Sequence, residues 1–253
     1  MTELLLHERM VWLMFALALL TFVLLQVITA PYGRHQRSGW GPTLPNRVAW
    51  ILMESPSVLL FGALFFVGEH RAEAVPLVLL GLWMMHYVQR TFIFPFRIRS
   101  DGKRMALSIA VTAFAFNLLN AYVNARWISH LGEEYTVTWF ADPRFLVGAA
   151  LMAAGWLINI HSDTILIHLR APGETGYKVP QGGLYRWVSC PNYFGEMLEW
   201  LGWALATWST AGLAFAVYTV ANLLPRARSH HQWYRDRFSD YPTNRRAVIP
   251  FIL

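Results

Sequence analysis

Three clusters of polar side chains lie inside or beside strongly apolar stretches, and each has the spacing of one helix face. Asn159, Asp163 and Arg170 are four and seven residues apart, so a continuous helix would place them on the same side. Comparable spacings recur in Asn192, Glu196 and Glu199 and in Arg226, His230 and Tyr234. An ionisable group at the centre of a bilayer costs about 2.5–3.5 kcal/mol and therefore needs a partner or a function. We expect the three faces to converge on one polar, water-accessible cavity that holds a large charged ligand.

Two further ionisable residues lie within apolar stretches. Glu54 is in VAWILMESPSVLL, with Trp50 one turn earlier on the same face, and Tyr87 shares a face with Arg90 in MMHYVQRTF. A carboxyl group and a phenol can exchange or donate protons to a ligand. The simpler alternatives are a carboxylate satisfied at the proline kink and an aromatic residue at the membrane interface. The neighbouring His86 is equally open to a structural or a functional role.

Several common catalytic motifs are missing from the sequence. Gly182-Gly183 lacks the Walker spacing and its lysine, and no G-x-G-x-x-G opens a helix after a strand. The histidines have no zinc-ligand spacing, so we expect no metal site. Cys190 is expected to be a small packed residue, and Pro191 after it favours a helix start whose positive end would stabilise an anion. Any nucleotide must then be held by membrane helices and their loops.

The composition is that of a polytopic membrane protein. Of the 253 residues, 55% are hydrophobic and 14% are charged, whereas soluble domains carry about 25% charged residues. A single cysteine excludes an intramolecular disulfide. Apolar runs of suitable length predict an all-α protein with seven spans. These are Met10–Ile28, Val48–Val67, Val75–Phe96, Met105–Val123, Phe145–Ile167, Tyr193–Trp208 and Gly212–Leu224.

The first and last spans each carry a specific expectation. Met10–Ile28 is longer than the apolar core of a signal peptide and lacks a basic start, so we expect it to be retained. The last two spans are short, and Ser209-Thr210-Ala211 between them predicts a tight helical hairpin.

Lys and Arg residues gather in alternate connecting regions, which places the amino terminus outside and the carboxyl terminus in the cytosol. This distribution accounts for the net charge of +6 without nucleic acid. A long basic loop follows Ile167, and a long basic tail follows Leu224. Together they indicate a ligand with several negative charges that enters from the cytosol.

Two long motifs resemble the steroid 5α-reductase family. They are NIHSDTILIHLRAPGETGYKVPQGGLYRWVSCPNYFGEMLEWLGWALATWS and SHHQWYRDRFSDYPTNRRAVIPFIL, and DPRFLVG and HYVQRTF add to the match. The resemblance covers Tyr87 to the carboxyl terminus, and Ala49–Ser57 in part. It implies one membrane reductase domain over residues 1–253, with substrate and catalytic helices in 47–100 and a cofactor-binding part in 145–253.

The resemblance also implies a reaction. NADPH would reduce the C4–C5 double bond of a 3-oxo-Δ4 steroid by hydride transfer to the β-carbon of the enone, giving a 5α-steroid. The partners would be a steroid or steroid-like lipid and membrane lipids, without nucleic acid, and the protein would be a monomer. The membrane would be a bacterial inner membrane or that of the endoplasmic reticulum, with the cofactor site facing the cytosol.

Residues at matching positions are assigned roles by the same resemblance. Cofactor contacts are implied for Asn159, Asp163, Arg170, Tyr177, Asn192, Glu196, Arg226, His230 and Tyr234, with Arg34 and Lys103 at matching basic loop positions. Glu54 and Tyr87 match the catalytic pair that engages the 3-keto oxygen, and Trp50, Met53, Trp200 and Phe215 would line the substrate. Met53 stands where the family commonly has glutamine. A thioether donates no hydrogen bond, which leaves the ligand-orienting role of that glutamine open.

Other functions are compatible with the sequence. A related reductase could act on an enoyl thioester, a polyprenol or another sterol. An isoprenylcysteine-type methyltransferase would have a similar carboxyl-terminal half, but it does not need the pair of Glu54 and Tyr87. A non-catalytic lipid- or sterol-binding membrane protein is favoured only by Met53.

Overall fold

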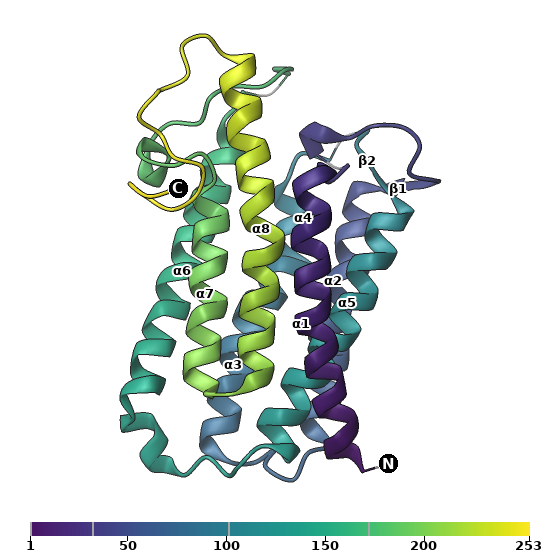
Figure 1. Cartoon of the computed structure of the whole chain (residues 1–253), viewed down its shortest axis with the longest axis vertical. Helices are drawn as coiled ribbons and strands as arrows, with labels where there is room; N and C mark the ends of the chain where they lie inside the picture. Colours follow the sequence, from purple (N-terminus) through teal and green to yellow (C-terminus); the bar gives the residue numbers. More distant parts are fainter. Residues whose placement is uncertain (1, 32, 101, 172) are drawn as a thin grey trace.

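The structure is a computed structural model that describes residues 2–31, 33–100, 102–171 and 173–253. Long helices run side by side along the long axis of the molecule (Figure 1). They are α1 (Glu3–Val27), α2 (Asn46–Phe66), α3 (Ala74–Val88), α5 (Leu107–Arg126), α6 (Pro143–His168), α7 (Pro191–Thr207) and α8 (Thr210–Arg237). The four-residue α4 (Phe94–Arg97) follows α3 through a π-helical turn, Gln89–Ile93, and a second π-helical turn, Trp127–Leu131, extends α5. The predicted all-α fold is confirmed.

Five of these helical segments are long and apolar enough to cross a membrane. They are Glu3–Val27, Asn46–Phe66, Ala74–Arg97, Leu107–Leu131 and Pro143–His168. Their outward faces carry large exposed apolar side chains, of which Trp12 is 71% exposed and Leu19 67%. Such a surface is stable in lipid rather than in water. The predicted span Tyr193–Trp208 lies in α7 except for Trp208, which follows the helix, and the predicted span Gly212–Leu224 lies in α8.

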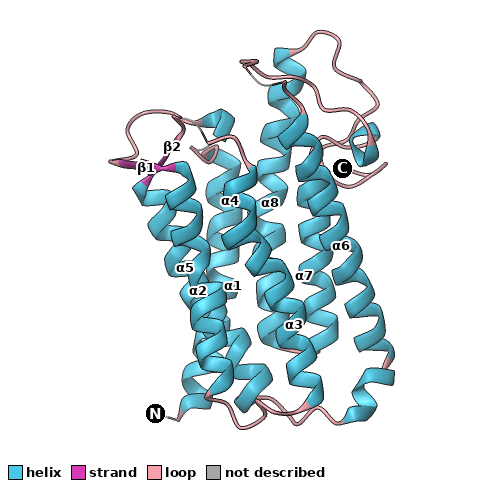
Figure 2. Cartoon of the chain, turned by 180° about the vertical axis from the view of Figure 1, so that it is seen from behind, coloured by secondary structure: helices cyan, strands magenta, loops and turns pink. Residues whose placement is uncertain are grey.

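Some element boundaries differ from the sequence prediction. Met105, predicted to begin a span, lies in β2 (Arg104–Ala106), which pairs antiparallel with β1 (Thr43–Pro45) at one end of the bundle (Figure 2). The strands form because the segments entering α2 and α5 run side by side. α8 continues beyond Leu224 to Arg237, so much of the predicted basic tail is helical.

The predicted hairpin between the last two helices is confirmed. Trp208 adopts the left-handed conformation, with φ of 43°, after α7 ends at Thr207. The Ser209 hydroxyl then accepts a hydrogen bond from the backbone N–H of Gly212 at 2.9 Å. A serine in this position satisfies one of the otherwise free N–H groups of the first helical turn.

Aromatic side chains fill the centre of the bundle. Trp83, Trp200 and Trp203 are at most 1% exposed, and the ring centre of Trp83 is 5.4 Å from that of Trp200 and 5.1 Å from that of Trp203. The indole nitrogen of Trp83 donates to the Ser57 carbonyl oxygen at 2.8 Å, so its polar atom is satisfied. This core ties α3 to α2 and α7 and fixes how the polar faces meet.

Glycines allow α6 and α7 to pack closely along their length (Figures 1 and 2). A Cβ atom on Gly155 of α6 would lie 2.4 Å from the carbonyl oxygen of Gly195 in α7, and one on Gly202 would lie 2.5 Å from that of Gly148. Small residues at such positions let two backbones approach where lipid supplies no hydrophobic driving force between helices. The close contact sets the distance between the polar residues at the ends of both helices.

Candidate active site

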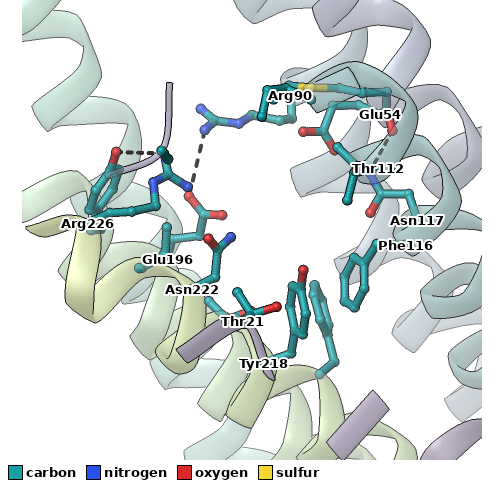
Figure 3. A pocket seen from close by; sticks show the side chains of 18 of the residues that line it. Thr21, Glu54, Arg90, Thr112, Phe116, Asn117, Glu196, Tyr218, Asn222 and Arg226 are labelled. Carbon is teal, nitrogen blue, oxygen red and sulfur yellow. Dashed lines mark hydrogen bonds and ion pairs between the residues drawn. The ribbon is translucent and has the colours of Figure 1, made fainter. Parts of the chain in front are cut away.

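A cavity of about 320 Å³ lies between α1, α2, α3, α5, α7 and α8, a size within the range of small-molecule sites (Figure 3). Seven of the residues predicted from the sequence line it. They are Trp50, Met53, Glu54, Tyr87, Glu196, Phe215 and Arg226. The cavity therefore joins residues predicted for substrate with residues predicted for cofactor.

Glu54 and Tyr87 reach this cavity from α2 and α3, and side chains of α5 hold both of them. The amide nitrogen of Asn117 donates to Oε2 of Glu54 at 3.1 Å and to the carbonyl oxygen of Met53 at 2.7 Å. The amide nitrogen of Asn120 donates to the Tyr87 hydroxyl oxygen at 3.3 Å. Because that oxygen accepts, the Tyr87 O–H remains able to donate to a ligand.

The asparagines of α5 were missed by the sequence prediction. Asn117, Asn120 and Asn124 occur at i, i+3 and i+7 within an apolar span, which is the same helical spacing that identified the other clusters. Asn124 donates to Oδ1 of Asn120 at 2.9 Å and accepts from the Trp203 indole at 2.8 Å. The same periodicity, applied also to a face that consists of amides alone, would have found these residues.

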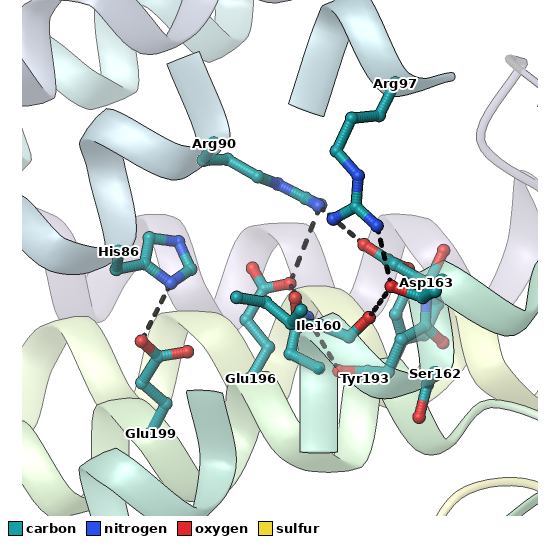
Figure 4. Close-up of polar contacts among 12 residues, drawn as sticks. His86, Arg90, Arg97, Ile160, Ser162, Asp163, Tyr193, Glu196 and Glu199 are labelled. Atoms are coloured by element: carbon teal, nitrogen blue, oxygen red, sulfur yellow. Dashed lines mark hydrogen bonds and ion pairs between the residues drawn. The ribbon is translucent and has the colours of Figure 1, made fainter. Parts of the chain in front are cut away.

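The first two predicted polar faces meet at Arg90 (Figure 4). Arg90 donates to Oδ2 of Asp163 at 3.2 Å and lies 3.8 Å from Oε2 of Glu196. Asn192 donates to the other Asp163 oxygen at 3.0 Å, and Asn159 donates to the Asn192 carbonyl oxygen at 3.0 Å. One cation thus bridges carboxylates from α6 and α7. The sequence placed Arg90 beside Tyr87 without assigning it a role in the site.

The third predicted face reaches the same region through Tyr193, which also lines the cavity. Arg226 donates to the Tyr193 hydroxyl at 2.8 Å, and Nε2 of His230 lies 3.2 Å from the same oxygen. Nδ1 of His230 is 3.0 Å from Nε2 of His35, which belongs to the 3₁₀ turn Gly33–His35. Burial, together with the neighbouring Arg34, Arg226 and His35, holds the pKa of His230 well below its usual range.

Arg34 lies among aromatic side chains from two distant segments. Its guanidinium carbon is 4.4 Å from the ring centre of Tyr234, 4.9 Å from that of Trp233 and 5.7 Å from that of Tyr177. These are cation–π distances. Within the described ranges, Nη1 of Arg34 is buried and has no hydrogen-bond partner. An anionic ligand would supply the missing acceptor.

Two predicted cofactor residues lie away from this centre. The prediction that Arg170 shares a helix face with Asp163 is wrong, because α6 ends at His168 and Arg170 instead donates to the Gly176 carbonyl oxygen at 2.8 Å. Ala171-Pro172-Gly173 follows, and the residue before a proline is driven out of the helical conformation. Lys103 is exposed in the loop before β2.

Two residues predicted at the cavity lie behind its wall. Trp200 is 1% exposed, and its ring centre is 5.4 Å from that of Tyr87 and 4.4 Å from that of Phe215. It therefore supports the wall from the core side. Glu199, the third member of the second polar face, lies one turn deeper in the bundle than Glu196, and Oε1 of its carboxyl group is 2.9 Å from Nδ1 of His86.

The histidines, the carboxylates and Cys190 bear on metal and thiol chemistry. No group of three or more His, Cys, Asp or Glu side chains among the described residues is arranged to hold a metal ion. Burial raises the pKa of the Cys190 thiol to about 12, so the thiolate that would act as a nucleophile is disfavoured.

Comparison with known proteins adds to this geometry. The family model described as 3-oxo-5-alpha-steroid 4-dehydrogenase matches residues 103–253. The chain is 47% identical over 251 residues to the steroid 5-alpha-reductase DET2 of Solanum lycopersicum, which covers 98% of this chain and 97% of the relative. It is 46% identical over 253 residues to the 3-oxo-5-alpha-steroid 4-dehydrogenase 1 of Mus musculus, which covers 99% and 98%. With this similarity along nearly its whole length, the chain belongs to the steroid 5α-reductase family.

Proposed function

We propose that the protein reduces the C4–C5 double bond of 3-oxo-Δ4 steroids to 5α-steroids with NADPH. The observation that carries the proposal is the cavity that Glu54 shares with Glu196 and Arg226 (Figure 3). Tyr87 lines the same cavity. A carbonyl substrate needs a proton-donating pair, and a dinucleotide needs a polar, cationic wall. The names of the relatives support a steroid as the substrate.

The polar groups of the site fit an anionic dinucleotide. Arg34 has a buried N–H that lacks an acceptor in the described part of the chain, and Arg226 lines the cavity. Both would hold phosphate groups, since guanidinium groups match phosphate oxygens in charge and shape. Asn192 and Glu196 offer an amide and a carboxylate to the neutral parts of the ligand. When bound, reduced nicotinamide supplies a hydride.

Tyr87 and Glu54 would act on the steroid carbonyl group. The Tyr87 hydroxyl accepts from Asn120, which leaves its proton directed to the 3-keto oxygen. Glu54, held by Asn117, would orient that carbonyl or share a proton with Tyr87. Negative charge develops on the oxygen during reduction, so a fixed donor lowers the barrier. Loss of one such donor typically reduces turnover by about 10²–10³-fold.

Purified protein in detergent, incubated with NADPH and testosterone, tests the proposal. We expect a decrease in absorbance at 340 nm and a 5α-reduced product. Tyr87→Phe and Glu54→Gln should reduce turnover by about 10²-fold or more with little change in NADPH affinity. Tyr135→Phe is the matched control, because the Tyr135 hydroxyl donates to the Thr207 carbonyl oxygen away from the cavity. Binding of NADPH without oxidation would contradict the proposed reaction, and equal loss of NADPH affinity in both variants would contradict the assigned roles.

The proposal extends to the membrane arrangement. α7 and α8 would complete seven spans, with the amino terminus outside and the cofactor side facing the cytosol. The alternation of basic connecting regions supports this orientation, and the two termini lie at opposite ends of the bundle (Figure 1). A reporter protein fused to the carboxyl terminus should be protected from protease added outside intact cells. Cleavage of that reporter would reverse the orientation.

A further inference from the structure

A pair of ionisable side chains lies deeper in the bundle than Arg90 and has no part in the mechanism above. His86 of α3 is 4% exposed and Glu199 of α7 is 0% exposed, and His86 Nδ1 lies 2.9 Å from Glu199 Oε1 (Figure 4). Over the described ranges, Oε2 of Glu199 is buried without a hydrogen-bond partner. A buried carboxyl group in this setting must be neutralised by a proton or by a cation. The pair therefore retains an exchangeable proton between the imidazole and the carboxyl group.

His86 also reaches the cavity. It is one of the lining residues, together with Tyr87, which follows it on α3. Its Nδ1 is engaged by Glu199, and the second ring nitrogen points away from that carboxyl group (Figure 4). Nε2 is therefore the atom that can meet a ligand. Since the His86 and Tyr87 ring centres are only 4.9 Å apart, both groups can act on one bound molecule.

The helix that carries Glu199 also connects the pair with the polar end of the site. Asn192, Glu196 and Glu199 lie at i, i+4 and i+7 on α7, which begins at Pro191. Glu199 is thus about 12 Å from the start of the helix, at 1.5 Å per residue. Glu196 lies between these levels and lines the cavity. Because His86 and Glu196 line the same cavity, water that enters it from the polar end can return a proton to His86.

We infer that His86, oriented by Glu199, delivers the proton that the α-carbon of the steroid enone receives. This inference rests on the proposed function. Reduction adds one hydride to the β-carbon, and the electrons of the C=C bond shift toward the carbonyl oxygen. That oxygen takes the proton of Tyr87, which gives an enol. The enol double bond then takes a proton from His86 Nε2 at the α-carbon, while the enol O–H proton returns to Tyr87. His86 regains its proton from water in the cavity that it lines, so the net reaction consumes one hydride and one solvent proton.

The position and face of the new proton test this assignment. Wild-type protein that reduces testosterone with NADPH in D₂O should place deuterium on one face of C4, as read by NMR of product from a brief incubation. In His86→Gln we expect turnover to fall at least tenfold and deuterium to appear on both faces, because the released enol is protonated by solvent. Glu199→Gln, which keeps the size of the side chain, should shift both readouts in the same direction. Unlabelled product kept in D₂O reports the background exchange.

NADPH binding separates a catalytic role from a structural one. Both variants should bind NADPH as the wild type does. If His86→Gln reduces testosterone at the wild-type rate with deuterium on a single face, the inference is overturned. If both variants lose NADPH binding, the pair only ties α3 to α7, and the inference is overturned as well. If wild-type protein itself yields no reduced steroid, the proposed function fails and the inference falls with it.

Discussion

Gly155→Ala tests the close contact between α6 and α7 on which the polar site depends. The new Cβ would lie 2.4 Å from the carbonyl oxygen of Gly195 and 2.5 Å from the backbone nitrogen of Glu199. Backbone atoms cannot rotate out of the way as a side chain can. Because ordinary contacts between heavy atoms are about 3.5 Å, the two helices must separate locally by about 1 Å.

The energetic consequence can be isolated with a matched variant. Overpacking costs about 1–3 kcal/mol, against the roughly 1 kcal/mol that alanine gains over glycine within a helix. Gly81→Ala in α3 has the same propensity gain, and nothing lies within 4 Å of its Cβ. We therefore expect Gly155→Ala to unfold about 2–12 °C below Gly81→Ala, from about 2–4 °C per kcal/mol for a chain of this length.

The same displacement should reach the site. Asn159 donates to the Asn192 carbonyl oxygen at 3.0 Å, so a separation of about 1 Å would break this hydrogen bond. We expect Gly155→Ala to bind NADPH more weakly than Gly81→Ala in a fluorescence titration. Equal melting temperatures and equal NADPH affinities for the two variants would refute the account of how α6 and α7 position the site.

Arg90, the pair of His35 and His230, and Asn117 each make contacts whose loss can be measured. Arg90→Met should lower the free energy of unfolding by about 3–5 kcal/mol in denaturant titrations, because the buried Asp163 loses the cation that bridges it to the partly buried Glu196; a loss below about 1 kcal/mol would contradict that role. Burial and nearby arginines depress the pKa values of His35 and His230, so the unfolded chain binds more protons below about pH 6.5. The free energy of unfolding should therefore keep its full value above that pH and fall by up to about 1.4 kcal/mol per histidine for each pH unit below it. If the free energy of unfolding of His35→Gln falls equally steeply with pH, His35 does not contribute to this pH dependence. Asn117→Leu should reduce turnover by about 10–100-fold at unchanged NADPH affinity, because Glu54 loses its donor; wild-type turnover would show that the hydrogen bond is dispensable.

Helical periodicity predicted much of the polar site because it is a local property. Asn159 and Asp163 lie on one face of α6, and Asn192 and Glu196 lie on one face of α7, as their spacing indicated. Their common partner, Arg90, was not predictable in that role, because its contact with them depends on how α3 packs against α6 and α7. The sequence contains the faces, whereas the packing of the bundle decides which faces meet.

The sequence prediction was wrong about the helix face of Arg170 and did not predict the aromatic surroundings of Arg34, and each has a specific cause. The spacing of Arg170 was correct for a helix, but the helix stops at His168, before the proline that follows in the sequence. The proline two residues after Arg170 in the sequence was a local signal for the end of the helix, and the helical spacing alone does not take it into account. The aromatic surroundings of Arg34 carried no local signal, because Tyr177 and Tyr234 come from segments far apart in the chain.

Methionine at residue 53, where the family commonly has glutamine, is compensated by a side chain of α5. A glutamine at that position would offer an amide next to Glu54, and methionine offers none. Asn117 supplies an amide from the opposite helix, and it donates both to the Met53 carbonyl oxygen at 2.7 Å and to Glu54 at 3.1 Å. The orientation of Glu54 therefore does not require a polar side chain at residue 53. Met53 by itself thus gives little support to a non-catalytic protein, since the carboxyl group it adjoins is still held by a hydrogen bond at the cavity wall.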